Sequence, residues 1–97
     1  MSDDTYSGWT NRETWALMLW INNDESLQDM AREFIRDAET ARSWTESMFT
    51  RSGYVDTFGD KWPDALADIA EDIGSLWRIN YYEVAESILE DVSELTA

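Results

Sequence analysis

The sequence predicts an all-α domain, a compact bundle of four to five short helices, with a short extended segment near residues 50–60 as an open alternative. Apolar residues recur at the three- and four-residue spacing of helices in several segments, and helix-start signals precede them. The 97 residues include only one Pro and four Gly, so helix breakers are few. Six Trp, four Tyr and three Phe can fill a small core, since each aromatic buries roughly 150–250 Å². We expect residues 1–97 to form one domain, frayed at 1–7.

The first helix is expected over about residues 11–22. Thr10 followed by Glu13 fits a capping box, in which Thr10 is the N-cap and Glu13 reaches back to its amide. The apolar residues Trp15 and Leu19 follow, and the Asn-Asn-Asp run at 22–24 ends the helix.

The second helix has the clearest pattern. Apolar residues follow its helical repeat at Leu27, Met30, Ala31, Phe34, Ile35 and Ala38. A further stripe continues at Ala41, Trp44, Met48 and Phe49. The sequence leaves open whether this stripe belongs to the same helix or follows a break near residues 40–43.

The segment 50–60 carries two Gly and is predicted to be a loop, with Tyr54, Val55 and Phe58 turned back onto the core. Pro63 suits the first position of the next helix. The buried face of that helix is expected to include Leu66, Ile69, Ala70, Ile73 and Trp77.

The last helix is expected to begin at Asn80, which forms a second capping-box candidate with Glu83. Its apolar stripe comprises Tyr81, Val84, Ala85, Ile88, Leu89, Val92 and Leu95.

The charge of the chain limits its partners. Twenty-one Asp and Glu stand against six Arg and one Lys, a net charge of −14. Such a charge repels nucleic acid and anionic lipid and attracts basic protein surfaces, so direct nucleic-acid binding is not expected. The N-terminus lacks the basic region of a signal peptide, and no apolar run approaches the roughly 20 residues of a membrane span. We therefore expect a cytoplasmic protein that does not bind membranes.

The acidic residues concentrate toward the C-terminus, with a net charge of −6 over residues 1–59 and −8 over residues 60–97. Two sets recur at helical spacing, so each should form one exposed row. The first row comprises Asp64, Asp68, Glu71 and Asp72, and the second comprises Glu83, Glu86, Glu90, Asp91 and Glu94. Like charges at these spacings destabilise a helix by roughly 0.2–0.5 kcal/mol per pair, which suggests a use beyond solubility. The plain alternative is that they are solvated outer faces of amphipathic helices.

Most catalytic chemistry lacks its usual residues. The chain has no Cys and no His, which removes the commonest nucleophile–base pairs and metal ligands. No phosphate-binding Gly loop is present, and the segment from Asp56 to Asp60 lacks the remaining ligands of a calcium loop. The sequence predicts a protein that is not an enzyme and has no cofactor or metal site.

The most distinctive segment reads Gly-Trp-Thr-Asn-Arg-Glu-Thr-Trp at 8–15 and Leu-Trp-Ile-Asn-Asn-Asp-Glu at 19–25. It resembles a family of short proteins from phages, plasmids and archaea with spaced Trp residues, and this resemblance suggests an anti-CRISPR-like protein. The resemblance covers under a fifth of the chain and implies a mobile-element context rather than an activity. Core packing and capping can explain the motif. Alternatively Trp9 or Trp20 stays exposed as an interface anchor, with Trp20 the residue we assign to partner binding.

Two hypotheses follow. In the first, a phage- or plasmid-encoded inhibitor acts in the host cytoplasm as an acidic DNA mimic, its two carboxylate rows blocking the nucleic-acid-binding surface of a basic partner such as a CRISPR effector or restriction enzyme. In the second, a helical adaptor or regulatory protein, monomeric or homodimeric, is acidic because of solubility or adaptation to a salt-rich cytoplasm.

Overall fold

The computed structural model describes residues 8–96, with side chains as far as Ser93. The all-α class is confirmed, and the described residues contain six α-helices and one short 3₁₀ helix rather than four to five helices. The elements are α1 (Arg12–Asn23), α2 (Glu25–Phe34), α3 (Ala38–Phe49), α4 (Arg51–Phe58), α5 (Asp64–Ile73), η1 (Leu76–Arg78) and α6 (Tyr81–Thr96).

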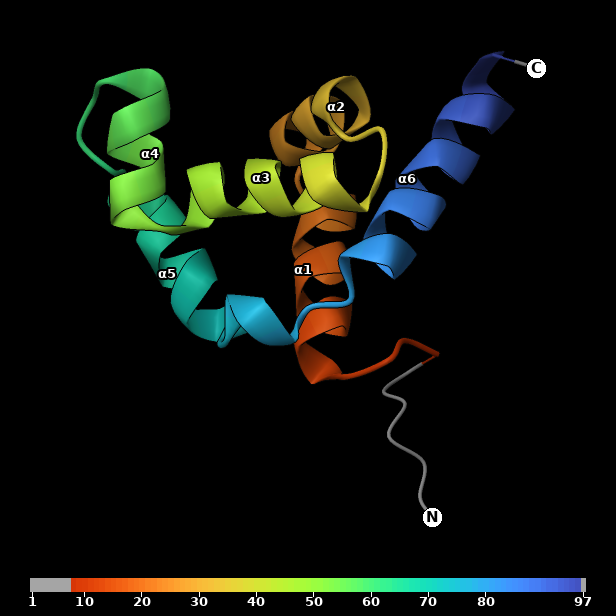
Figure 1. The fold of residues 1–97 in the computed structure, drawn as a ribbon, viewed down its shortest axis with the longest axis horizontal. Helices are drawn as coiled ribbons and strands as arrows, with labels where there is room; N and C mark the ends of the chain where they lie inside the picture. The colour runs from red at the N-terminus through yellow and green to blue at the C-terminus, as the bar shows by residue number, and fades with distance from the viewer. Residues whose placement is uncertain (1–7, 97) are drawn as a thin grey trace.

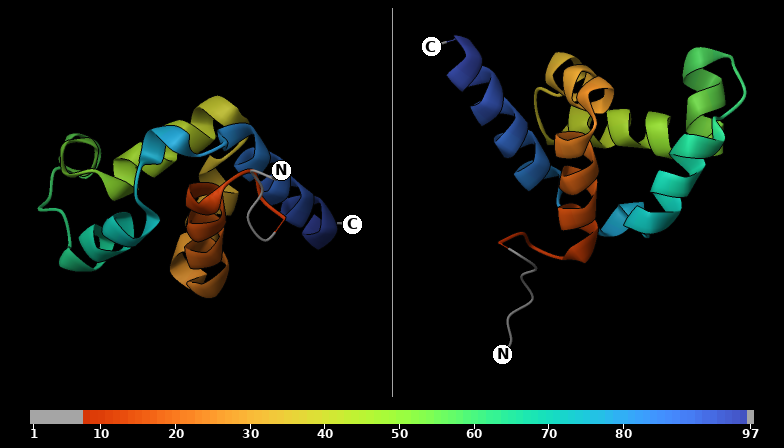
Figure 2. Two further views of the ribbon diagram at one scale, coloured as in Figure 1. Left: turned by 90° about the horizontal axis from the view of Figure 1, so that it is seen from below. Right: turned by 180° about the vertical axis from the view of Figure 1, so that it is seen from behind.

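The helices are arranged around α1, which lies between α5 on one side and α6 on the other (Figures 1 and 2). Helix α3 runs across α1, contacts both α5 and α6, and carries α4 at its far end (Figure 1). The molecule is flattened, with extents of 40 × 37 × 23 Å. This layout fixes where each surface helix presents its polar face.

The core is built mainly on α1, whose residues Ala16, Leu17, Met18 and Ile21 are at most 1% exposed. Every other helix except α4 adds buried apolar residues to it. These are Leu27, Ala31 and Ile35 from the α2 region, Ala41, Trp44, Met48 and Phe49 from α3, Ile69 and Ile73 from α5, Ile79 after η1, and Val84, Ala85 and Ile88 from α6. Leu19 and Leu89, both expected in the core, are 41% and 38% exposed because they lie at the edges of their apolar stripes.

Helix α1 is capped by Asn11, so the predicted N-cap at Thr10 is wrong by one residue. The Asn11 Oδ1 atom accepts hydrogen bonds from the Thr14 backbone N–H at 2.9 Å and from the Thr14 hydroxyl at 2.7 Å. The Thr10 backbone N–H instead donates to Glu83 Oε1 on α6, at 3.0 Å. A residue from the last helix thus fills the position expected for Glu13.

The apolar stripe over residues 27–49 belongs to two helices, with the break at 35–37 rather than near 40–43. Asp37 and Thr40 form a capping box that starts α3. The Thr40 N–H donates to Asp37 Oδ1 at 2.8 Å, and the Asp37 N–H donates to Thr40 Oγ1 at 2.9 Å. These bonds from the Thr40 backbone and hydroxyl lower the pKa of Asp37 below its usual range. Arg36 closes α2 by donating to the carbonyl of Arg32 at 2.8 Å.

The loop predicted over 50–60 is wrong, because most of it forms α4. Thr50 caps this helix by accepting from the Gly53 N–H at 3.0 Å, and Gly59 ends it at φ +72°. Val55 and Phe58 are 44% and 46% exposed, so they do not turn back onto the core as expected. Helix α4 packs chiefly on α3, with a close backbone approach at Gly53 and a hydrogen bond from the Thr57 hydroxyl to the Ser47 hydroxyl at 3.1 Å, and it contributes no buried side chain.

The last two helices begin near the predicted positions, but α5 ends earlier than predicted. Pro63 is the N-cap of α5 rather than its first residue, and α5 ends at Gly74, where φ is +93°. Trp77 therefore falls outside the helix, and its predicted place on the buried face is wrong. The capping box at Asn80 is half formed: Asn80 Oδ1 accepts from the Glu83 N–H at 3.1 Å, but the Glu83 carboxylate bonds to Thr10.

Among the described residues, no helix combines the length and apolar character required to cross a membrane.

The substitution Gly53→Ala should lower the free energy of unfolding. In an ordinary helix this change is favourable by roughly 0.5–1 kcal/mol, but here the added Cβ would collide with the carbonyl oxygen of Glu46 in α3. Chemical denaturation followed by circular dichroism measures the effect. Ser52→Ala, an exposed site one residue earlier, is the matched control and should be neutral or stabilising. Stabilisation by Gly53→Ala would contradict the close α3–α4 contact.

Candidate protein-interaction surface

The first acidic row lies on α5. Asp64, Asp68, Glu71 and Asp72 are all exposed, as their helical spacing predicts. The last three line one shallow surface depression at the C-terminal half of the helix. The i, i+4 spacing separates neighbouring carboxylates by about 6 Å along the helix axis.

The second acidic row lies on α6. Glu86 and Glu90 are exposed, whereas Glu83 and Asp91 are half-buried. These four side chains line a second polar depression together with Gly8 and Trp9. Glu94 lies in α6, but its side chain is outside the described part of the chain.

The two rows do not lie side by side. Helices α5 and α6 flank α1 on opposite sides in all three views (Figures 1 and 2). The structure therefore brings together the members within each row, and presents two separate acidic faces instead of one double row.

Two of the acids serve the fold. Asp72 accepts a hydrogen bond from the Trp20 indole N–H at 2.8 Å and lies 3.9 Å from the Arg12 guanidinium. Glu83 accepts from the Thr10 N–H. Both carboxylates thus hold α1 against its neighbours, and their negative charges are partly used inside the molecule.

The remaining acids of the two rows have no such use. In the described part of the chain, no hydrogen bond or ion pair involves the carboxylates of the following residues: Asp64, Asp68, Glu71, Glu86, Glu90 and Asp91. Their charge does not stabilise the folded chain through a local partner, and it is available to a molecule that docks there.

The N-terminal motif acts chiefly as a structural joint. The Arg12 guanidinium donates to the carbonyl oxygens of Asp72 and Ile73, at 2.9 and 3.2 Å, and so caps the C-terminal end of α5. The buried Thr14 hydroxyl accepts from the Asn80 backbone N–H at 2.9 Å and joins the start of α1 to the start of α6. The Asn11 side-chain amide donates to the carbonyl oxygen of Arg78 at 2.7 Å. The motif residues therefore hold three distant segments together.

Trp20, which we assigned to partner binding, is half-buried against the core, and its indole N–H is bonded to Asp72. Trp9 is also half-buried against the core. The exposed indole is instead that of Trp77, which is 82% exposed. Sequence reasoning missed it because its spacing continued the α5 stripe. The signal that could have placed it outside α5 is Gly74, which ends the helix before it.

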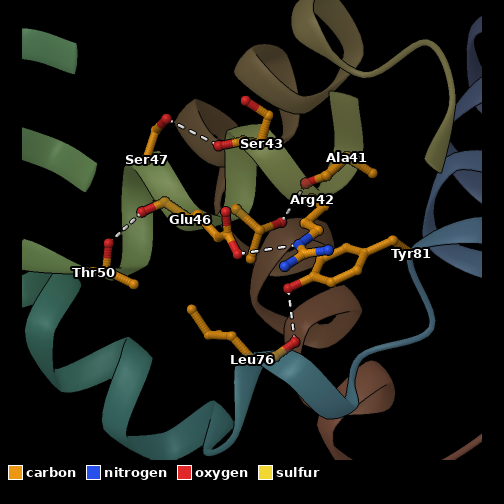
Figure 3. A network of polar contacts seen from close by, with 9 residues as sticks. Ala41, Arg42, Ser43, Glu46, Ser47, Thr50, Leu76 and Tyr81 are labelled. Carbon is orange, nitrogen blue, oxygen red and sulfur yellow. Dashed lines mark hydrogen bonds and ion pairs between the residues drawn. The ribbon is translucent and has the colours of Figure 1, made fainter. Parts of the chain in front are cut away.

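The turn that carries Trp77 is fixed by its neighbours. The Tyr81 hydroxyl donates to the carbonyl oxygen of Leu76 at 2.8 Å (Figure 3). Figure 3 also shows Arg42 and Glu46 of α3 beside Tyr81, paired with each other at 3.2 Å. Burial of the phenol, and secondarily the negative charge of Glu46, raise the pKa of Tyr81 to about 12 against a weaker opposing effect of Arg42.

The described residues contain no group of three acidic side chains placed to hold a metal ion.

These features define a small all-α protein with two separate acidic helix faces and one exposed Trp between them along the chain. The chain belongs to a family of unknown function, DUF7249, whose model matches residues 2–96. No match was found among curated proteins, and none among solved structures.

The substitution Thr14→Val should destabilise the protein by about 2 kcal/mol, because it leaves the Asn80 N–H without its acceptor in a partly buried site. For a domain of this size the melting temperature should fall by roughly 8–16 °C. Thermal unfolding measures the change.

Thr45→Val is the matched control, since Thr45 is equally buried but bonds only to the Ala41 carbonyl one turn earlier in its own helix. Loss of the Thr45 hydroxyl leaves no backbone donor unpaired, so the melting temperature should change little. Equal effects of the two substitutions would show that the α1–α6 joint contributes no special stability.

The raised pKa of Tyr81 makes stability depend on pH. Folding favours the neutral phenol, so the stabilisation is fully present below pH 10 and is lost as the pH rises toward about 12. Tyrosinate absorbance should show an ionisation near pH 12 that Tyr81→Phe removes. An unchanged titration curve in that variant would refute the assignment.

Proposed function

We propose that this protein is an acidic inhibitor, encoded by a phage or plasmid, that occupies the nucleic-acid-binding surface of a host defence complex such as a CRISPR effector or restriction enzyme. The observation that carries the proposal is the set of carboxylates on α5 and α6 that have no partner within the described residues. These carboxylates repel one another and form no bonds that offset this repulsion. A basic partner would therefore be attracted to them.

The face of α5 is the stronger candidate for the mimic itself. Its exposed carboxylates recur about every 6 Å along the axis, while DNA phosphates recur at about 3.4 Å of rise on each strand. The row can therefore meet side chains that contact every second phosphate. Helix α6 lies on the opposite side of α1 from α5. The acidic row of α6 therefore forms a second contact area and does not imitate the second DNA strand beside the α5 row.

The mechanism is steric and electrostatic. Lys and Arg side chains that would pair with phosphates pair instead with the carboxylates, and the bound helix excludes nucleic acid from the site. Binding should weaken steeply as salt rises, because much of its free energy comes from charge pairing that salt screens.

The test is affinity capture from host lysate with a charge-reversed variant, Asp68, Glu71, Glu86 and Glu90→Lys. Asp72 and Glu83 are left intact because they hold the fold. The wild-type protein should retain a nucleic-acid-handling complex that salt or duplex DNA releases, and the variant should retain at least tenfold less of it.

The matched control reverses four exposed acids elsewhere, Asp29, Glu33, Asp56 and Asp60→Lys. Both variants change the net charge equally, so only the position of the charges differs. The control should still capture the complex. Undiminished capture by the α5–α6 variant would refute the mimicry mechanism, and an equal loss of capture in both variants would assign the effect to overall charge.

A second candidate function, an adaptor protein, is favoured by an apolar groove between α2, α3 and α4. Its walls include Phe34 and Phe58, which are 52% and 46% exposed, and its floor includes Trp44. In this case the acidity reflects adaptation to salt, and the protein should unfold at low ionic strength, where its charges repel each other without screening. A melting temperature that stays high at low salt would remove this explanation of the charge.

A further inference from the structure

Trp77 differs from every other Trp in the described residues. Trp44 is buried, and the remaining four are half-buried, namely Trp9, Trp15, Trp20 and Trp62. Trp77 is 82% exposed, and its indole N–H has no partner in the described part of the chain. An exposed Trp ring leaves a large apolar area in water, and Trp is among the residues most enriched at binding hot spots.

The turn around Trp77 is rigid. The Arg78 N–H donates to the Ser75 carbonyl at 3.1 Å, and the Ile79 N–H donates to the Leu76 carbonyl at 3.2 Å. The Tyr81 hydroxyl and the Asn11 side-chain amide hold the carbonyls on either side of Trp77 from outside the turn. Because the backbone is already ordered, docking on the indole costs little conformational entropy.

The charges near this turn select the partner. Trp77 lies five positions after Asp72, so at most about 18 Å of chain joins their Cα atoms. An interface of standard size covers about 800 Å² per partner, a disc of roughly 16 Å radius. A partner whose contact area is centred between Trp77 and Asp72 therefore covers the indole and the C-terminal end of α5 together.

The Arg side chains near the turn do not cancel the negative charge at the C-terminal end of α5. Arg78 lies with its guanidinium carbon 5.9 Å from the Trp77 ring centroid and pairs with Glu13 at 3.8 Å. Arg12 pairs with Asp72. Each cation near the turn thus has its own carboxylate, while Asp68 and Glu71 remain unpaired. A basic surface complements this region, and an acidic surface is repelled by it.

We propose that Trp77 is the apolar anchor of a docking surface for a basic protein segment, in which an Arg or Lys of the partner packs on the free part of the indole ring while its neighbours pair with the α5 carboxylates. This inference rests on the proposed function, because it assigns the anchor of the same electrostatic interface. Cation–π contact and ring burial then supply the part of the affinity that salt does not remove.

The test uses the full-length protein and an arginine-rich peptide, with a peptide in which Gln replaces each Arg as the uncharged probe. At low ionic strength the arginine peptide should bind, shift the Trp emission to shorter wavelength and protect it from acrylamide quenching. The difference between wild type and Trp77→Phe isolates the contribution of Trp77. Trp77→Ala should weaken binding about tenfold, and Trp77→Phe should weaken it less because the ring is kept.

Phe34→Ala is the matched control, since Phe34 is an aromatic residue of α2 that is 52% exposed and lies far along the chain from Trp77, and its loss should change the affinity less than twofold. If Asp68 and Glu71→Lys abolishes binding while Trp77→Ala leaves it unchanged, the anchor is refuted and the proposed function survives. If the wild-type protein does not bind the arginine peptide, both fail. Equal binding of the uncharged peptide would overturn the basic character of the partner.

Discussion

The fold depends on an exchange of hydrogen bonds between the starts of the first and last helices. The Thr14 hydroxyl lies at its centre, donating to Asn11 and accepting from Asn80. The Glu83 carboxylate accepts a hydrogen bond from the Thr10 backbone N–H, and the Asn80 side-chain amide donates one to the Thr10 hydroxyl at 3.0 Å. Helix ends leave backbone groups unpaired, and here each end supplies part of the cap of the other. Because this joint fixes α6 relative to α1, it also determines where the acidic face of α6 is presented.

The acidic residues therefore divide into two groups that look alike in the sequence. Asp72 and Glu83 stand at the ends of their rows nearest the joint and are bonded within the molecule. The carboxylates of residues farther along the same helices, such as Asp68 and Glu90, form no hydrogen bond or ion pair within the described part of the chain. A net charge of −14 does not distinguish these groups, but the partner of each carboxylate does. The distinction decides which acids can bind another molecule without loosening the fold.

The sequence predicts the helices that have a strong apolar repeat and misplaces those held by contacts between distant segments. The stripe through Ile88 corresponds to α6, since burial and helical period coincide there. Helix α4 escaped prediction because Gly53 signals a loop by composition, whereas here it permits close approach to α3. The cap of α1 was misplaced by one residue because Thr10, the expected cap, instead bonds to Glu83, which lies seventy-three positions along the chain. No local pattern indicates this bond. The acidic rows could be predicted as exposed from spacing alone, but their separation by α1 could not, because no local pattern encodes it.

The joint between Thr14 and Asn80 also has a consequence for biosynthesis. A ribosome releases the chain from the N-terminus, so when α1 emerges the Thr14 hydroxyl lacks the Asn80 N–H and the Thr10 N–H lacks the Glu83 carboxylate until the start of α6 follows. The contacts that close the joint are supplied only once the start of α6 has been made. Completion of the fold thus waits for the start of α6, and a product truncated before Asn80 lacks the residues that close it.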